Sequence, residues 1–194
     1  MNKFLLVFYI ITAINCLIPY KVNSDDWLLV KYGIDIDGRH DFVNPTGYQY
    51  DVENKPTIAL EYIFDFDNDL CLGIGSSLQY PRAIYNSYAE FEFSSIYGLM
   101  KIKSNYKKVS PVVNIYLGCS MYGGNLYYTL GSELSGGLYY GLGLGVSAPS
   151  YELELLYSVN MGKMEGFYYN GYSLYNYIYD VEYRKVTILL GYKL

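Results

Sequence analysis

The sequence has few charged side chains, one histidine and no apolar run as long as the roughly 20 residues of a membrane-spanning helix. Charged residues make up 17% of its 194 residues, below the approximately one quarter that is typical of a soluble domain. The single histidine excludes a multi-histidine zinc site and no cluster of cysteines replaces it, so we expect neither a metal nor a cofactor. The formal net charge of -5 disfavours nucleic acid as a partner.

The amino terminus has the pattern of a cleaved secretory signal. Lys3 precedes an apolar stretch at residues 4–14, which is too short to span a bilayer as a helix. Small residues near Ser24 suit the cleavage site, so we expect a signal peptide at 1–24 and a single domain at 25–194. Lipoprotein processing at Cys16 is the alternative, although Asn15 stands where such signals prefer a small residue.

Tyrosine and glycine are both frequent, with 27 and 19 copies. Aromatic residues favour extended backbone, and a helix would not tolerate the glycine density of residues 138–146. In that stretch the even positions are Leu, Tyr, Leu, Leu and Val, and most odd positions are Gly. Such an alternation has the period of a β-strand.

The same alternation recurs along the chain and predicts eight strands. Their connections alternate between short ones, at 67–69, 104–109 and 148–150, and longer ones, at 37–56, 81–87, 123–135 and 165–180. Short periplasmic turns and longer outer loops are typical of transmembrane barrels, so we predict an all-β, antiparallel, up-and-down transmembrane β-barrel. The predicted strands are 27–36, 57–66, 70–80, 88–102, 111–122, 136–147, 151–163 and 181–194.

The apolar faces of these strands predict which side of the barrel meets lipid. Together they carry roughly forty large apolar side chains, whereas the interior of an eight-stranded barrel holds about three layers of four. Most of them must therefore point outwards, with glycines and charges inside. On 88–102 this assigns Phe91, Phe93, Tyr97 and Leu99 to the lipid side. A soluble secreted β-barrel or β-sandwich binding a small apolar ligand is the alternative.

With its signal, eight strands, loop asymmetry and Gly-rich strand before Ala148-Pro149-Ser150, the chain resembles the OmpA-like and OmpX-like small outer-membrane β-barrels. The resemblance covers about residues 26–194 and implies localisation in the cell outer membrane, contact with its lipid, and insertion by the barrel-insertion machinery. That family usually ends on an aromatic residue. Here the chain ends on Leu194, and the nearest aromatic residue is Tyr192.

Charged residues on the inward parity predict a lumenal network that plugs the barrel, because a charge in a narrow bore must be paired or hydrated. An ion path through the lumen is the alternative, and general acid–base catalysis by paired carboxylates is disfavoured. The residues assigned to this network are Lys31, Glu61, Glu92, Glu152, Glu154 and Lys185.

Two further residue types invite a chemical role. His40, in the first outer loop, is interpreted as a solvated histidine. The alternative is an outer-leaflet lipid-modifying enzyme that uses His40 with a serine, although no motif joins them. Cys71 and Cys119 fall on different strands and opposite faces, so we expect both to be small fillers and not a disulfide.

The last outer loop is unusually rich in aromatic side chains, which offer rigid, amphipathic contact area. It could bind a protein or glycan, form an interfacial aromatic girdle, or reflect a general preference for tyrosine. We therefore expect a non-enzymatic barrel with a structural or adhesive role. The candidate binding residues are Phe167, Tyr168, Tyr169, Tyr172, Tyr175, Tyr177 and Tyr179.

Overall fold

The computed structural model describes residues 26–44, 48–67, 69–85, 89–104, 109–125, 133–169 and 172–194. The predicted signal peptide and Cys16 lie outside these residues. No helix in the described ranges is long and apolar enough to cross a membrane. The strands are β1 (Trp27–Asn44), β2 (Tyr48–Asp51), β3 (Pro56–Asp67), β4 (Leu70–Gln79), β5 (Arg82–Ala83), β6 (Glu90–Lys103), β7 (Ser110–Asn125), β8 (Glu133–Ser147), β9 (Tyr151–Tyr169) and β10 (Leu174–Lys193).

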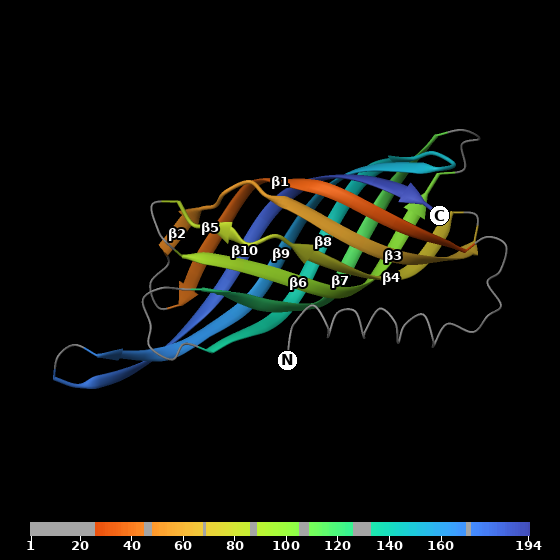
Figure 1. The fold of residues 1–194 in the computed structure, drawn as a ribbon. Coiled ribbons are helices and arrows are strands. Elements are labelled where there is room, and N and C mark those ends of the chain that lie inside the picture. Colours follow the sequence, from red (N-terminus) through yellow and green to blue (C-terminus); the bar gives the residue numbers. More distant parts are fainter. Residues whose placement is uncertain are drawn as a thin grey trace.

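Eight of these strands form a closed antiparallel ring (Figure 1). The order around it is β1, β3, β4, β6, β7, β8, β9 and β10, and β10 pairs with β1 to close it. The backbones of Leu28 and Leu194 are hydrogen-bonded to each other in both directions, so strand β1 begins beside the end of the chain. The predicted eight-stranded antiparallel barrel is confirmed. Strands β2 and β5 are short additions that pair with β1 and β6 at the opposite end.

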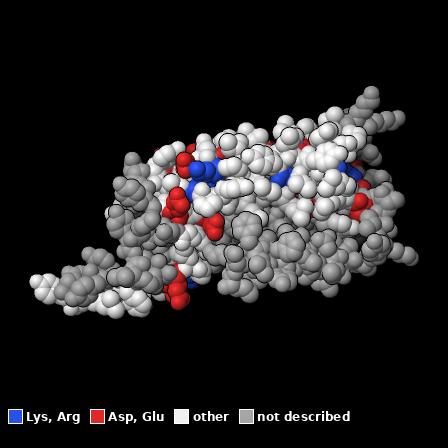
Figure 2. Space-filling model, in the orientation of Figure 1, with Lys and Arg blue, Asp and Glu red and all other residues white. Residues whose placement is uncertain are grey.

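The outer wall of the ring is apolar. Large hydrophobic side chains alternate with buried ones along every long strand, and some are more than half exposed, such as Leu117 at 62% and Leu144 at 56%. Most of the described surface in Figure 2 carries no charge of either sign. A soluble monomer rarely exposes an apolar patch of more than a few hundred Å². An apolar belt around a closed barrel is the surface that a bilayer requires.

The predicted orientation of one strand is wrong. Phe91, Phe93, Tyr97 and Leu99 of β6 are buried inside the barrel, whereas Ile96 and the other even-numbered residues point outwards. Both parities of this strand contain apolar side chains, so hydrophobicity alone did not distinguish them. The space inside the barrel determines the orientation of β6 instead, because glycines on neighbouring strands leave room for its large rings. A Cβ on Gly75 would lie 2.7 Å from Cε2 of Tyr97.

The predicted long outer loops are also partly wrong, because strands continue through much of them. β1 extends to Asn44, β9 to Tyr169, and β10 begins at Leu174. In β1 the register with β10 shifts between Ile36 and Arg39, and Asp37 has a φ of 51°. This β-bulge changes which parity points inwards. It places His40 inside the barrel, fully buried, and overturns its interpretation as a solvated loop residue.

The two described cysteines are free, as the sequence predicted. Cys71 is buried on the lumenal side of β4, and Cys119 is exposed on the outer face of β7. Their opposite orientation follows from strand parity and keeps the two sulfur atoms apart.

Candidate functional site

The lumen contains two clusters of buried charges. We call the one nearer the chain ends the lower cluster and the one farther from them the middle cluster. Lys31 is the centre of the lower cluster, because the Nζ atom lies 2.9 Å from Glu61, 3.3 Å from Glu152 and 2.6 Å from Glu154. Lys101 forms a second ion pair with Glu152 at 2.6 Å. The Tyr116 hydroxyl donates to Glu154 at 2.7 Å. Strands β1, β3, β6, β7 and β9 thus converge on one network.

The middle cluster surrounds Asp35. Its carboxylate accepts bonds from Lys185 at 2.9 Å and from Thr57 and Thr187 at 2.8 and 2.7 Å, and Arg82 pairs with it at 2.6 Å. Both carboxylate oxygens of Asp35 therefore face donors. Removing a buried charge from water is costly, and this coordination offsets the cost.

The two clusters complement each other in charge. Three carboxylates face two lysines in the lower cluster, whereas one carboxylate faces two cations in the middle cluster. Among the described residues the buried lumenal charges therefore balance. A cavity about the size of a water molecule adjoins both clusters and is lined by Glu61 and Lys185 among others.

The sequence and the structure agree only in part on the lumenal residues. The structure brings Lys31, Glu61, Glu152 and Glu154 together, and it places Lys185 in the separate middle cluster. Glu92 does not belong to either cluster. It is half-buried on the outward parity of β6, between the inward Phe91 and Phe93, so its assignment to the lumen is corrected.

Sequence reasoning missed two important cations. Lys101 shares β6 with Phe91, so the wrong orientation of that strand hid it. Arg82 lies in a segment predicted to be an outer loop, and it reaches back into the barrel, where it also donates to Gln79 and Tyr183. Among the described residues no group of three or more histidine, cysteine or acidic side chains has the arrangement of a metal site.

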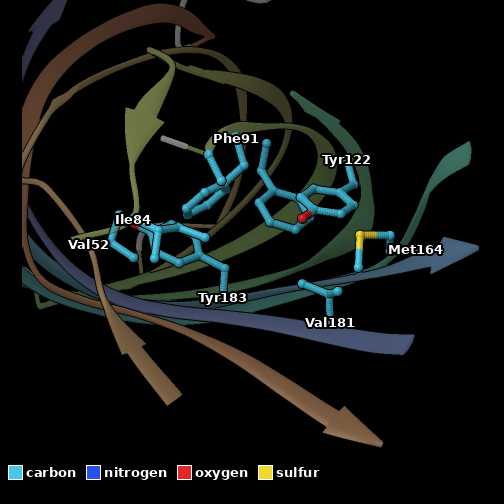
Figure 3. Packing of buried hydrophobic residues seen from close by; sticks show 9 residues of the cluster. Val52, Ile84, Phe91, Tyr122, Met164, Val181 and Tyr183 are labelled. Atoms are coloured by element: carbon cyan, nitrogen blue, oxygen red, sulfur yellow. The ribbon is translucent and has the colours of Figure 1, made fainter. Parts of the chain in front are cut away.

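The outer end of the lumen contains a cluster of buried apolar side chains, which we call the aromatic cap. Figure 3 shows the rings of Phe91, Tyr122 and Tyr183 directed toward one another, with Val52 and Ile84 over one side. Val52 and Ile84 are joined by an isolated antiparallel bridge that connects the two outer segments. The cap consists of Val52, Ile84, Ala89, Phe91, Phe93, Tyr122, Met164, Val181 and Tyr183.

His40 is packed into this cap and is not a surface base. Its ring centroid lies 4.5 Å from that of Phe91 and 5.0 Å from that of Phe42, and its Nε2 lies 3.2 Å from the Tyr122 hydroxyl. The residue lies beyond the lipid-facing part of β1. Burial lowers the pKa of His40 to about 3, because the apolar surroundings disfavour the charged ring.

Beyond the cap, β9 and β10 continue as a two-stranded extension, which we call the outer ribbon: residues 166–169 of β9 and 174–179 of β10. Figure 1 shows it projecting past the other strands. Phe167 and Tyr175 are about half exposed and Tyr172 is 95% exposed. Tyr177 and Tyr179 instead pack partly against the cap. The backbones of Tyr168 and Tyr169 lie in β9, and their side chains are outside the described set.

Aromatic rings connect the ribbon with the neighbouring outer segment. The centroid distances are 5.1 Å for Tyr177–Tyr179, 5.6 Å for Phe42–Tyr179 and 6.0 Å for Phe42–Tyr50. The ring centroid of Tyr48 lies 6.5 Å from that of Tyr50, and the Tyr48 side chain is 60% exposed. The sequence prediction of an aromatic last loop therefore omitted the part of this surface that comes from β1 and β2.

Comparisons with known proteins give a fold but no sequence family. No protein-family model matches the chain, and no curated protein matches it. Solved structures do match. The outer membrane protein OprG from Pseudomonas aeruginosa gives a TM-score of 0.57 at 12% identity, covering 87% of this chain and 95% of that one.

Two further structures agree. Neisserial surface protein A gives a TM-score of 0.53 at 17% identity, and Ail, the attachment invasion locus protein of Yersinia pestis, gives 0.53 at 16%. In both cases 87% of this chain and 97% of the other are covered. The ring of eight strands, the apolar outer wall and these likenesses lead to one conclusion: this chain has the fold of the small eight-stranded outer-membrane β-barrel proteins.

Proposed function

We propose that this protein is a non-enzymatic, integral outer-membrane barrel that is closed to ion flow and binds an external surface through its aromatic outer end. A cleaved signal peptide at 1–24 would direct it across the inner membrane, and the barrel-insertion machinery would place it in the outer-membrane lipid. The observation that carries the proposal is the contrast between the two ends. The described lumen is filled with paired charges, whereas the outer ribbon exposes large aromatic side chains.

The plugged lumen is supported by packing and by charge. Lys31, Asp35 and Glu154 are each at most 1% exposed, and every one of them is held by short ion pairs. An ion crossing the barrel would have to break these pairs and displace the cap as well. In planar lipid bilayers the purified protein should show no long-lived conductance. A steady open channel in the wild type would contradict the plug.

A binding role is supported by the array of exposed rings on the ribbon and on β2. Tyrosine offers apolar contact area and a hydroxyl at low conformational cost, so it suits a protein or glycan surface. One of the three similar proteins named above, Ail, is called an attachment invasion locus protein. We carry that role over only as part of this proposal.

The test is a binding assay on vesicles that carry the full-length mature protein, against immobilised host-cell surfaces. Replacing Phe167, Tyr175 and Tyr50 by Ser should abolish binding while leaving the barrel folded. Replacing the exposed but lipid-facing Tyr140 by Leu is the matched control and should leave binding unchanged. Retention of full binding by the triple variant would contradict an aromatic binding end.

Lipid-modifying catalysis receives no support from the geometry. His40, the histidine that would have to act as a base, is fully buried among aromatic rings and contacts the Tyr122 hydroxyl. A general base has to be within hydrogen-bond reach of the proton that it removes. The His40 ring, buried in the apolar cap with a strongly lowered pKa, therefore serves to pack the cap.

A further inference from the structure

The outer ribbon has an unusual free edge. Residues 174–179 of β10 pair with β9 on one side. On the other side the pairing between β1 and β10 ends at Asn44 and Asp180, so no described strand lies beside residues 174–179 there. Along β9, the pairing with β8 likewise ends at Glu133 and Glu165. The backbone groups along an unpaired edge are a template for another strand. Natural proteins usually protect such an edge with a charge, a proline or a bulge.

This edge lacks those protections. Residues 174–179 read Leu-Tyr-Asn-Tyr-Ile-Tyr, with no charged residue and no proline. Aromatic and β-branched residues favour extended structure, and a six-residue uncharged segment of this kind pairs readily with a copy of itself. Residues 166–169 on the other strand of the ribbon are also uncharged, and the charges next to the ribbon in Figure 2 lie at its base. The edge is therefore suited to an uncharged, extended partner strand.

The sequence of the edge is also self-complementary. In an antiparallel pair, residues directly opposite each other share a face of the sheet, so a two-fold axis must pass between two identical residues. With that axis at Asn176, Leu174 lies opposite Ile178 of the second copy and Tyr175 lies opposite Tyr177. Leu174 and Ile178 are 65% and 53% exposed on one face. Apolar residues then meet apolar ones, rings meet rings, and amide meets amide.

We propose that the outer ribbon pairs edge to edge with the ribbon of a second copy of this chain, and that the two copies lie in opposite membranes. The second part follows from symmetry. In a barrel wall the normal of the sheet is radial, so it lies in the plane of the membrane. A two-fold axis along that normal reverses the barrel axis, and the two barrels face each other across the gap between two membranes. This inference rests on the proposed membrane insertion and goes beyond the proposed binding role, because it assigns a partner to the backbone edge of the ribbon.

Clustering of vesicles tests the pairing directly. Phosphatidylcholine vesicles that carry the full-length mature protein should cluster, as measured by dynamic light scattering. Asn176→Lys places two lysines opposite each other at the two-fold axis, and Asn176→Asp places two carboxylates there. Each variant alone should reduce clustering about fivefold or more, because like charges directly opposite are destabilising. Mixing the two vesicle populations should restore clustering, because Lys then faces Asp.

The controls separate this proposal from its alternatives. Gln49→Lys and Gln49→Asp place the same charges on the exposed strand β2 and should leave clustering unchanged. In detergent, light scattering should give a dimer for the wild type and a monomer for Asn176→Lys, independently of orientation in vesicles.

Three outcomes would overturn the proposal. The first is that the wild-type protein floats with the vesicles but stays monomeric and does not cluster them. The second is that Asn176→Lys leaves clustering unchanged. The third is that vesicles with protein also cluster with protein-free vesicles, which would make lipid the partner. A wild type that fails to float with lipid would instead refute the proposed membrane insertion, and this inference with it.

Discussion

The Nζ atom of Lys31 lies 2.6 Å from Oε2 of Glu154, although 123 residues separate the two in the sequence. The pair is fully buried and joins β1 to β9 across the inside of the barrel. Glu61 of β3 contacts the same ammonium group from the other side. One lysine thus ties together strands that are formed at the two ends of the chain.

Removing the Glu154 carboxylate should strongly destabilise the barrel. Glu154→Ala leaves Lys31 with less compensation and removes the acceptor of the Tyr116 hydroxyl. Breaking a buried pair from one side costs about 3 kcal/mol or more. Urea unfolding in lipid vesicles measures this change. Glu165→Ala, on the same strand but exposed, is the control and should change the free energy of unfolding by less than about 0.5 kcal/mol.

Two glycines should respond very differently to the same added methyl group. In Gly75→Ala the new Cβ would lie 2.7 Å from Tyr97 and 2.9 Å from Cγ of Glu61, so buried groups must shift, at a cost of about 1–3 kcal/mol. In Gly98→Ala the nearest atoms are 3.9 Å away, on the outer face. That variant should be neutral or slightly stabilising. Equal losses in both would show that the lumen is not tightly packed.

The stability of the cap should fall in mild acid because of His40. Its pKa is lowered from 6.5 in the unfolded chain to about 3 in the folded one. The neutral His40 ring therefore adds its full share to the free energy of unfolding above about pH 6.5. This share is lost as the pH falls toward 3, because the unfolded state binds the proton first. Between pH 7 and pH 4.5 the loss should be about 3 kcal/mol.

His40→Gln isolates this effect, since glutamine keeps a polar group near the Tyr122 hydroxyl but does not titrate in this range. The carboxylates of the protein titrate in both forms, so the difference between the two pH profiles reports on His40 alone. Parallel profiles for the wild type and the variant would mean that the ring reaches water in the folded protein.

A charge on the outer wall should oppose insertion. Leu142 of β8 is half exposed in the middle of the apolar belt. Leu142→Arg should destabilise the inserted barrel by about 2–4 kcal/mol, the range for a cation near the bilayer midplane. Leu142→Phe preserves the apolar character and should insert normally. The measurement is the free energy of refolding into lipid vesicles, and tolerance of arginine would argue against lipid contact at this position.

The fold could be predicted from the sequence because the two-residue alternation of a strand and the length of a loop can both be read from short stretches of the chain. Leu138, Leu142 and Leu144 alternate with glycine along β8. Once the apolar side is placed outwards, this alternation determines which side chains face lipid and which face the lumen. β6 lacks such a contrast, since Phe91 and Ile96 are both apolar yet face opposite ways. Their orientation depends on which neighbouring strands supply glycines, and that information is not local.

The candidate sites were predicted less completely for similar reasons. Lys31 and Glu61 lie on adjacent strands with simple alternation, so their parity was sufficient to suggest that they meet. His40 follows a bulge at Ile36–Arg39, which reverses parity and cannot be inferred from hydrophobicity. Arg82 reaches its partner Asp35 from an outer segment, a long-range contact that only the closed barrel creates.

The central claim is that the apolar side chains face lipid while charges and rings fill the barrel, and spin-label accessibility tests it most directly. A nitroxide is attached to Leu142→Cys or, as the lumenal counterpart, to Ser158→Cys, in protein with Cys71 and Cys119 replaced by Ser. In lipid vesicles the label at position 142 should collide frequently with dissolved oxygen and rarely with a water-soluble nickel complex, and the label at position 158 should be shielded from both. Frequent collisions with nickel at position 142, or shielding from oxygen there, would contradict the account.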